Sequence, residues 1–100
     1  MILPSEGYLR GALLTHEHNG EEDRAAKVRA QIEAYAHLRP LDRERKQAEN
    51  AAQILRSAAK LCPDLADDLF ARANALTARA KKLRAYLGSE CAKIEARRLP

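Results

Sequence analysis

The segment DLADDLFARANALTARAKKLRAYL, residues 64–87, decides the fold of this 100-residue chain. Two rows of residues run along it at a spacing of seven: Leu69, Leu76 and Leu83 in one row, and Ala66, Ala73, Ala80, Leu87 and Ile94 in the other. Heptad spacing of this kind predicts a long helix with an apolar seam. Because the alanines are small, the seam should pack closely against a second helix.

Residues 41–61 supply that second helix. Its seam is predicted at the seven-residue row Leu41, Ala48, Leu55 and Cys62. The turn is predicted at Cys62-Pro63-Asp64, because proline suits the first position of a helix. Folding the chain back there pairs Leu55 with Leu69, Ala48 with Leu76, and Leu41 with Leu83. We therefore expect a long antiparallel helical hairpin over 40–100, whose basic last helix is extended or restarted toward Arg97 beyond Gly88.

The first part of the chain predicts a shorter helical hairpin over 1–39. Ser5 is a suitable N-cap for a helix over 6–18, and Asn19-Gly20 is a strong stop signal. A second helix is expected over 21–38, ending before Pro40. The predicted fold class is thus all-α, with two antiparallel hairpins, four helices and Ala/Leu-rich, coiled-coil-like packing. We expect the two hairpins to form one compact unit.

The last helix outruns its partner, which leaves an apolar row beyond the reach of residues 41–61. This row consists of Tyr86, Leu87, Cys91 and Ile94. Either the first hairpin or a second copy of the chain must cover it, because soluble monomers rarely expose such a patch. We expect self-association through these four residues into a homo-oligomer.

Positive charge gathers in the second part of the chain. Residues 1–38 carry four basic and six acidic groups, a net charge of −2, whereas residues 39–100 carry fourteen and eight, a net charge of +6. The predicted patch for phosphates or an acidic partner comprises Arg39, Arg43, Arg45, Lys46, Arg79, Lys81, Lys82, Arg84, Lys93, Arg97 and Arg98. The alternative is that these cations complement helix dipoles and keep the surface solvated.

Other kinds of site find little support in the sequence. His16 and His18 point to different faces of a helix, and Cys62 and Cys91 belong to no spaced ligand set, so we expect no metal or cofactor. No serine or cysteine has the setting of a catalytic nucleophile, so we expect no enzymatic activity. The chain shows no signal peptide and no apolar run of about 20 residues, so we expect no membrane contact. Two free thiols suit the cytoplasm.

The stretches LRGALL (9–14) and NGEEDRAAKVRAQI (19–32) resemble short Ala/Arg-rich helical proteins of actinobacteria and their phages. This resemblance assigns no family and no site residue, but it implies a virion or assembly component. We therefore expect a non-enzymatic adaptor or assembly protein that acts through protein–protein contacts, located in the cytoplasm or in a virion. The alternatives are a nucleic-acid-binding module that uses the basic end of 40–100, and a small inhibitor of a host nucleic-acid-binding enzyme.

Overall fold

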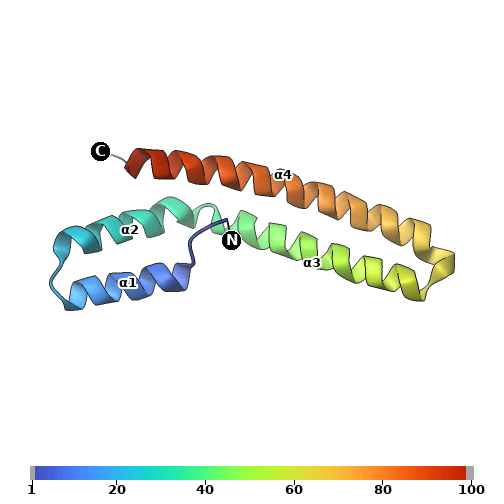
Figure 1. Ribbon diagram of the computed structural model, residues 1–100, viewed down its shortest axis with the longest axis horizontal. Helices are drawn as coiled ribbons and strands as arrows, with labels where there is room; N and C mark the ends of the chain where they lie inside the picture. The colour runs from blue at the N-terminus through green and yellow to red at the C-terminus, as the bar shows by residue number, and fades with distance from the viewer. Residues whose placement is uncertain (1, 99–100) are drawn as a thin grey trace.

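The computed structural model of the protein describes residues 2–98, and Figure 1 shows them as helices joined by short connections. The elements are α1 (Glu6–His18), α2 (Glu22–Ala36), α3 (Arg39–Leu61), a short 3-10 helix η1 (Pro63–Leu65) and α4 (Ala66–Arg98). Over the described residues there is no strand. The predicted all-α class is therefore confirmed.

The helices form an elongated molecule with extents of 63 × 25 × 15 Å. In Figure 1, α3 and α4 lie side by side after the chain reverses at η1, and α1 lies beside α2. The far part of α4 runs past the start of α3 and lies along α2. The protein is thus long and narrow, and α4 is the element shared by its two halves.

Local sequence explains where the first helices begin and end. The hydroxyl oxygen of Ser5 accepts a hydrogen bond from the N–H of Tyr8, as predicted for an N-cap. Gly20 has a φ of 70°, and its N–H donates to the carbonyl oxygen of Glu17. A left-handed residue here favours glycine and reverses the chain between α1 and α2. Pro40 lies in the first turn of α3, where it displaces no hydrogen bond, so the helix starts earlier than predicted, at Arg39.

The apolar rows predicted for α4 lie on its inward side. Ala73, Ala80, Leu83, Leu87 and Ile94 are all buried. Leu69 and Leu76 are partly buried near the turn. The helix continues without a break through Gly88, so it is extended rather than restarted.

The seam of α3 differs from the predicted row. Its buried positions include a second seven-residue row, made by Leu38 just before the helix and by Arg45, Ala52 and Ala59 within it. Of the predicted row, Ala48 is buried, Leu41 and Leu55 are partly buried, and Cys62 is exposed. Cys62 does not continue the buried row because α3 ends at Leu61. The predicted pairings across the seam, such as Leu55 with Leu69, stay predictions.

A separate apolar core joins the first half of the chain to the end of α4. It contains Leu3, Leu9, Val28, Tyr35, Leu38, Leu87, Cys91 and Ile94. The N-terminal arm that precedes α1 takes part directly, because the Sγ of Cys91 lies 3.7 Å from the carbonyl oxygen of Ile2, to which it donates. The first hairpin and the arm together therefore cover the part of α4 that extends beyond α3.

Candidate binding surfaces

The row predicted as an uncovered contact lies mostly inside the protein. Leu87, Cys91 and Ile94 are buried in the core just described, and only Tyr86 is about half exposed. Of the two covers considered for this row, the structure shows the first, because the N-terminal arm, α1 and α2 pack against it. Burial accordingly raises the pKa of the Cys91 thiol. The homo-oligomer itself stays a prediction, but Leu87, Cys91 and Ile94 are not accessible to a second copy of the chain.

Many cations of the predicted phosphate patch are already paired with carboxylates. Arg79 donates to Glu44, and Arg84 donates to Glu49, both across the α3–α4 seam. Lys93 lies 3.1 Å from Glu90 one turn away on α4. Such exposed pairs add little stability, but each lowers the charge that remains for a ligand.

Arg45 does not belong to a surface patch at all. Its side chain is buried, and its Nε and Nη2 atoms donate to the same carboxylate oxygen of Asp42, at 3.1 and 2.9 Å. Its Nη1 donates to Glu49 at 2.9 Å, and Glu49 also accepts from Arg84 at 2.7 Å. We call these four residues, Asp42, Arg45, Glu49 and Arg84, the seam network. The prediction that Arg45 is an accessible cation is wrong, because the α3 seam buries it against acids one turn away.

The seam network holds its carboxylates in the charged form. Burial raises the pKa of Asp42, but hydrogen bonds and charge from Arg45, with a smaller effect from Lys46, bring the pKa below its usual value. Hydrogen bonds from Arg84 and then from Arg45 likewise lower the pKa of Glu49. Among the described residues no buried side-chain nitrogen or oxygen lacks a hydrogen-bond partner. The network therefore has the full pairing that buried charges require.

Some cations of the predicted patch have no carboxylate partner among the described residues and can still bind an anionic ligand. Within residues 2–98, the structure gives no ion pair to Arg43, Lys81, Lys82 or Arg97. Arg39 donates to the carbonyl oxygen of Pro4, and Lys46 lies 3.4 Å from Asp42. The side chain of Arg98 lies outside the described part of the structure. The accessible positive charge is thus smaller than the predicted patch.

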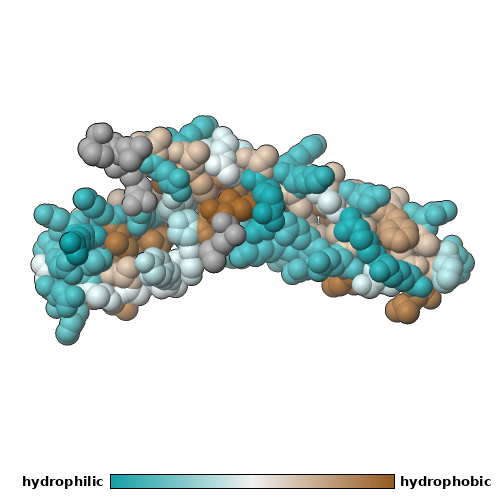
Figure 2. All heavy atoms as spheres, in the orientation of Figure 1, coloured by the Kyte–Doolittle hydropathy of each residue, from teal (hydrophilic) through white to brown (hydrophobic). Residues whose placement is uncertain are grey.

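Large apolar side chains are exposed at the turn between α3 and α4, a feature that the sequence analysis missed. Ile54 is 68% exposed, Leu61 83% and Leu65 54%. Figure 2 shows brown side chains standing out of the surface near this end of the molecule. We call these three residues the tip strip. Ile54 and Leu61 are seven residues apart and share a face of α3 outside the seam, which is the signal that could have revealed them.

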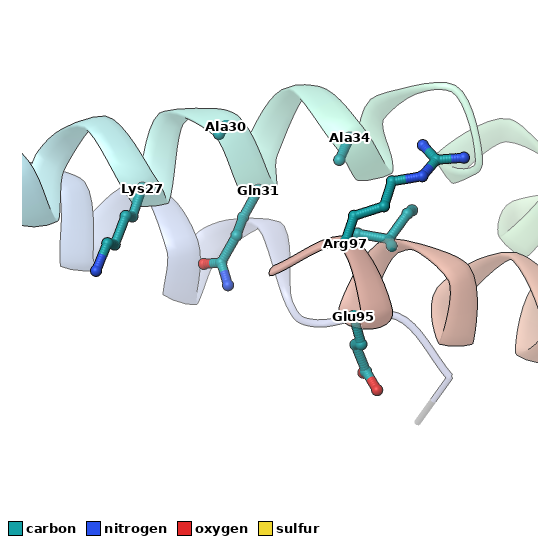
Figure 3. Close-up of a pocket in the computed structure, with 7 residues that line it drawn as sticks. Lys27, Ala30, Gln31, Ala34, Glu95 and Arg97 are labelled. Carbon is teal, nitrogen blue, oxygen red and sulfur yellow. The ribbon is translucent and has the colours of Figure 1, made fainter. Parts of the chain in front are cut away.

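A groove of about 610 Å³ lies between α2 and the end of α4. In Figure 3, Lys27, Ala30, Gln31 and Ala34 lie along α2, and Glu95 and Arg97 come from the end of α4. Ala30 and Ala34 give the α2 wall a small-side-chain surface, and the charged lining residues are Lys27, Glu95 and Arg97. The groove follows directly from the overlap of α4 with α2.

The histidines and cysteines form no metal centre in the part of the chain that the structure describes, where no group of three possible ligands gathers. His16 lies 3.2 Å from a carboxylate oxygen of Glu21 in the turn that follows α1. The hydrogen bond from His16 is the main cause of the lowered pKa of Glu21. Cys62 and Cys91 are both free thiols.

No helix within residues 2–98 combines the length and the apolar character needed to cross a membrane. Compared with models of protein families, with curated proteins and with solved structures, the chain matches none.

Proposed function

We propose that this chain is a non-enzymatic adaptor or assembly protein that binds another protein through the tip strip. The observation that carries this proposal is the exposure of Ile54, Leu61 and Leu65 near one end of the molecule, where they make up three of the seven large apolar side chains exposed among the described residues. Soluble proteins seldom expose large apolar side chains together unless a partner covers them. The sequence resemblance favours an assembly component, including one of a virus particle.

The charges beside the tip strip suggest the chemistry of the partner. Asp64, Asp67 and Asp68 adjoin the strip at the turn and at the start of α4. Asp68 pairs with Arg72 at 3.2 Å, whereas the structure gives no ion pair to Asp64 or Asp67 within the described residues. Complementary charges steer association and fix its orientation. The partner should therefore present an apolar surface bordered by lysine or arginine.

Site-specific photo-crosslinking in the native host tests this proposal. A photoreactive amino acid replaces Leu61, and in the control it replaces Glu33, which is exposed on α2. One protein should be captured from position 61 and not from position 33. Once purified, it should bind the unmodified chain, and Leu61→Asp should weaken binding at least about tenfold, since it removes a large apolar contact. Equal capture from both positions, or unchanged binding of Leu61→Asp, would reject the tip strip as the contact.

The second candidate function is nucleic-acid binding through the basic surface. It is favoured by the cations that have no ion pair within the described residues, Arg43, Lys81, Lys82 and Arg97. Phosphate contacts release counterions, so log K should fall with log salt at a slope near −0.9 per contact on duplex DNA. A steep salt dependence that becomes shallower in Lys81→Gln/Lys82→Gln would favour this candidate over the adaptor.

A further inference from the structure

A pocket of about 400 Å³ lies where the N-terminal arm, the start of α1 and the start of α3 meet. Three cations of α3 line it: Arg39, Arg43 and Lys46. Ser5, the N-cap of α1, and Gly7 in its first turn line the opposite side. Residues four and seven positions apart share one face of a helix, so the three cations form a continuous row along the wall.

One of these cations holds the N-terminal arm against α3, and another has no partner among the described residues and can bind a ligand. Arg39 donates through Nη1 to the carbonyl oxygen of Pro4, which holds the arm against α3. Lys46 stands 3.4 Å from Asp42 and is mostly exposed. Arg43 has no hydrogen bond or ion pair to any described residue. A ligand could therefore bind Arg43 without breaking an existing contact.

Two carboxylates also line the pocket, and both are already neutralised. Asp42 accepts two hydrogen bonds from Arg45, and Glu6 pairs with Arg10 at 2.9 Å. The pKa of Glu6 is lowered first by the hydrogen bond from Arg10, and to a smaller degree by the charges of Arg39 and Arg43. Among the residues that line the pocket, three cations therefore stand against two carboxylates, each of which has an arginine partner outside the lining.

We propose that this pocket binds a phosphate group, either as free phosphate or at the end of a nucleotide. The excess of positive charge in the lining suits an anion, and the planar fork of Arg43 and the ammonium of Lys46 suit the oxygens of a phosphate group. The N–H of Gly7 belongs to the first turn of α1, whose N–H groups have no acceptor within the helix, and it adds a neutral donor. The pocket accepts one anionic group rather than a length of nucleic-acid backbone.

NMR titration of the whole ¹⁵N-labelled chain tests the site. Inorganic phosphate and adenosine monophosphate are added separately, with adenosine and sodium chloride at matched ionic strength as controls. We expect the amide signals of Gly7 and Tyr8 to shift and saturate with one or both phosphate compounds and with neither control. If adenosine monophosphate binds more tightly than phosphate, the ligand is a nucleotide; equal affinity indicates the phosphate group alone.

Charge-removing variants decide whether the pocket is responsible. Arg43→Gln and the double variant Arg43→Gln/Lys46→Gln should weaken binding at least about tenfold, since each contact is a charge-assisted hydrogen bond. Arg72→Gln removes the same charge near the turn between α3 and α4, and its affinity should stay within about twofold of the parent. Shifts that do not saturate, or that saturate equally in Arg43→Gln, would overturn the proposal. Leu61→Asp should leave phosphate binding unchanged, so the site and the tip strip are tested independently.

Discussion

Arg45 shows how a charged side chain can occupy the seam of a helix pair. It is 5% exposed and stands in line with Leu38, Ala52 and Ala59. Taking a guanidinium out of water is costly unless its donors are bound and its charge is matched. Asp42 and Glu49, three residues before it and four after it, supply both conditions from the same helix. The short range of these contacts means that the pairing forms wherever α3 forms.

Removing Arg45 alone should be far more harmful than replacing the pair. Arg45→Ala leaves the buried carboxylate of Asp42 with only Lys46, so we expect the free energy of unfolding to fall by about 3 kcal/mol. The apolar replacement Asp42→Leu/Arg45→Met should be at least as stable as the parent. Urea denaturation followed by circular dichroism measures both. As a control, Arg72→Ala breaks an exposed pair and should change stability by less than about 0.5 kcal/mol.

The seam network also predicts how stability depends on pH. The pKa values of Asp42 and Glu49 lie below their usual values of 3.8 and 4.5 in the folded chain. A depressed carboxylate pKa stabilises the fold above the unfolded pKa, and this stabilisation is lost as the pH falls through the folded value. The urea midpoint should thus stay level down to about pH 5 and fall progressively below about pH 4. The decrease should be smaller in Asp42→Asn/Glu49→Gln; an equal decrease would place the sensitive groups elsewhere.

At the scale of the helix, α4 is continuous because the packing of its apolar face outweighs the low helix propensity of Gly88. Gly88 lies in the middle of the helix, where glycine is unfavourable because it has the most backbone freedom to lose. Leu87 and Cys91 lie on either side of it and are buried in the apolar core that joins the first half of the chain to the end of α4. Packing of these neighbours therefore holds the helix together across a residue that would favour a break in isolation.

Substituting alanine at two glycines should have opposite effects. Apart from its chain neighbours and the backbone of α4 itself, no heavy atom lies within 4 Å of a Cβ placed on Gly88, so Gly88→Ala should raise stability by about 0.5–1 kcal/mol. Gly20 has positive φ, so Gly20→Ala should lower stability by about 1–2 kcal/mol despite equally open surroundings. Thermal unfolding of the two variants in parallel measures the difference. A fall in melting temperature for Gly88→Ala would show that its backbone needs glycine.

Local signals were sufficient to predict most helix boundaries. Ser5, Gly20 and Pro63 act within a turn of their own positions, and the structure has helix ends or turns at each. The seven-residue rows of α4 were equally clear, because one row is leucine throughout, the other is alanine followed by Leu87 and Ile94, and neither contains a charged residue. The buried face of α4 therefore follows from its sequence alone.

The α3 seam and the candidate surfaces were harder to predict. A search for apolar repeats passes over the row through Arg45, because a buried arginine is recognised only together with its acids. The spacing of Asp42, Arg45 and Glu49 carried that signal. The cover over Leu87 and Ile94 depends on contacts between residues far apart in sequence, which periodicity does not encode. The phosphate pocket likewise needs three segments to meet.

The molecule as a whole is a rod with two different interiors. Its Cα radius of gyration is 18.8 Å, against about 13 Å for a compact chain of this length. One half is an alanine seam between α3 and α4, and the other is the core of leucine, tyrosine and isoleucine around the end of α4. Because each half packs against a different part of α4, a destabilising substitution at one end of α4 should unfold mainly the half that packs against that end.

A charged residue at the covered end of α4 should unfold the first half rather than dissociate an oligomer. Leu87→Asp places a carboxylate in the apolar core around the end of α4, so we expect the free energy of unfolding to fall by about 3 kcal/mol or more. Hydrogen exchange should become fast in α1 and α2, while the α3–α4 seam near Ala59 and Ala73 stays protected. The neighbouring Tyr86→Asp is the matched control at an exposed position, with an expected change below about 0.5 kcal/mol. If Leu87→Asp instead leaves every helix intact and halves the sedimenting mass, the row is an intermolecular contact.

The contact between Ile2 and Cys91 has a consequence for synthesis. A ribosome makes the arm, α1 and α2 first, yet the residues that cover their apolar side, Leu87 to Ile94, come last. At about 5–20 residues per second, the interval between Ala36 and Leu87 lasts roughly 3–10 s. For that interval the apolar residues of the arm, α1 and α2 have only one another to pack against. The cellular lifetime of this protein therefore begins with a state open to chaperones and proteases, which ends only when the final helix emerges.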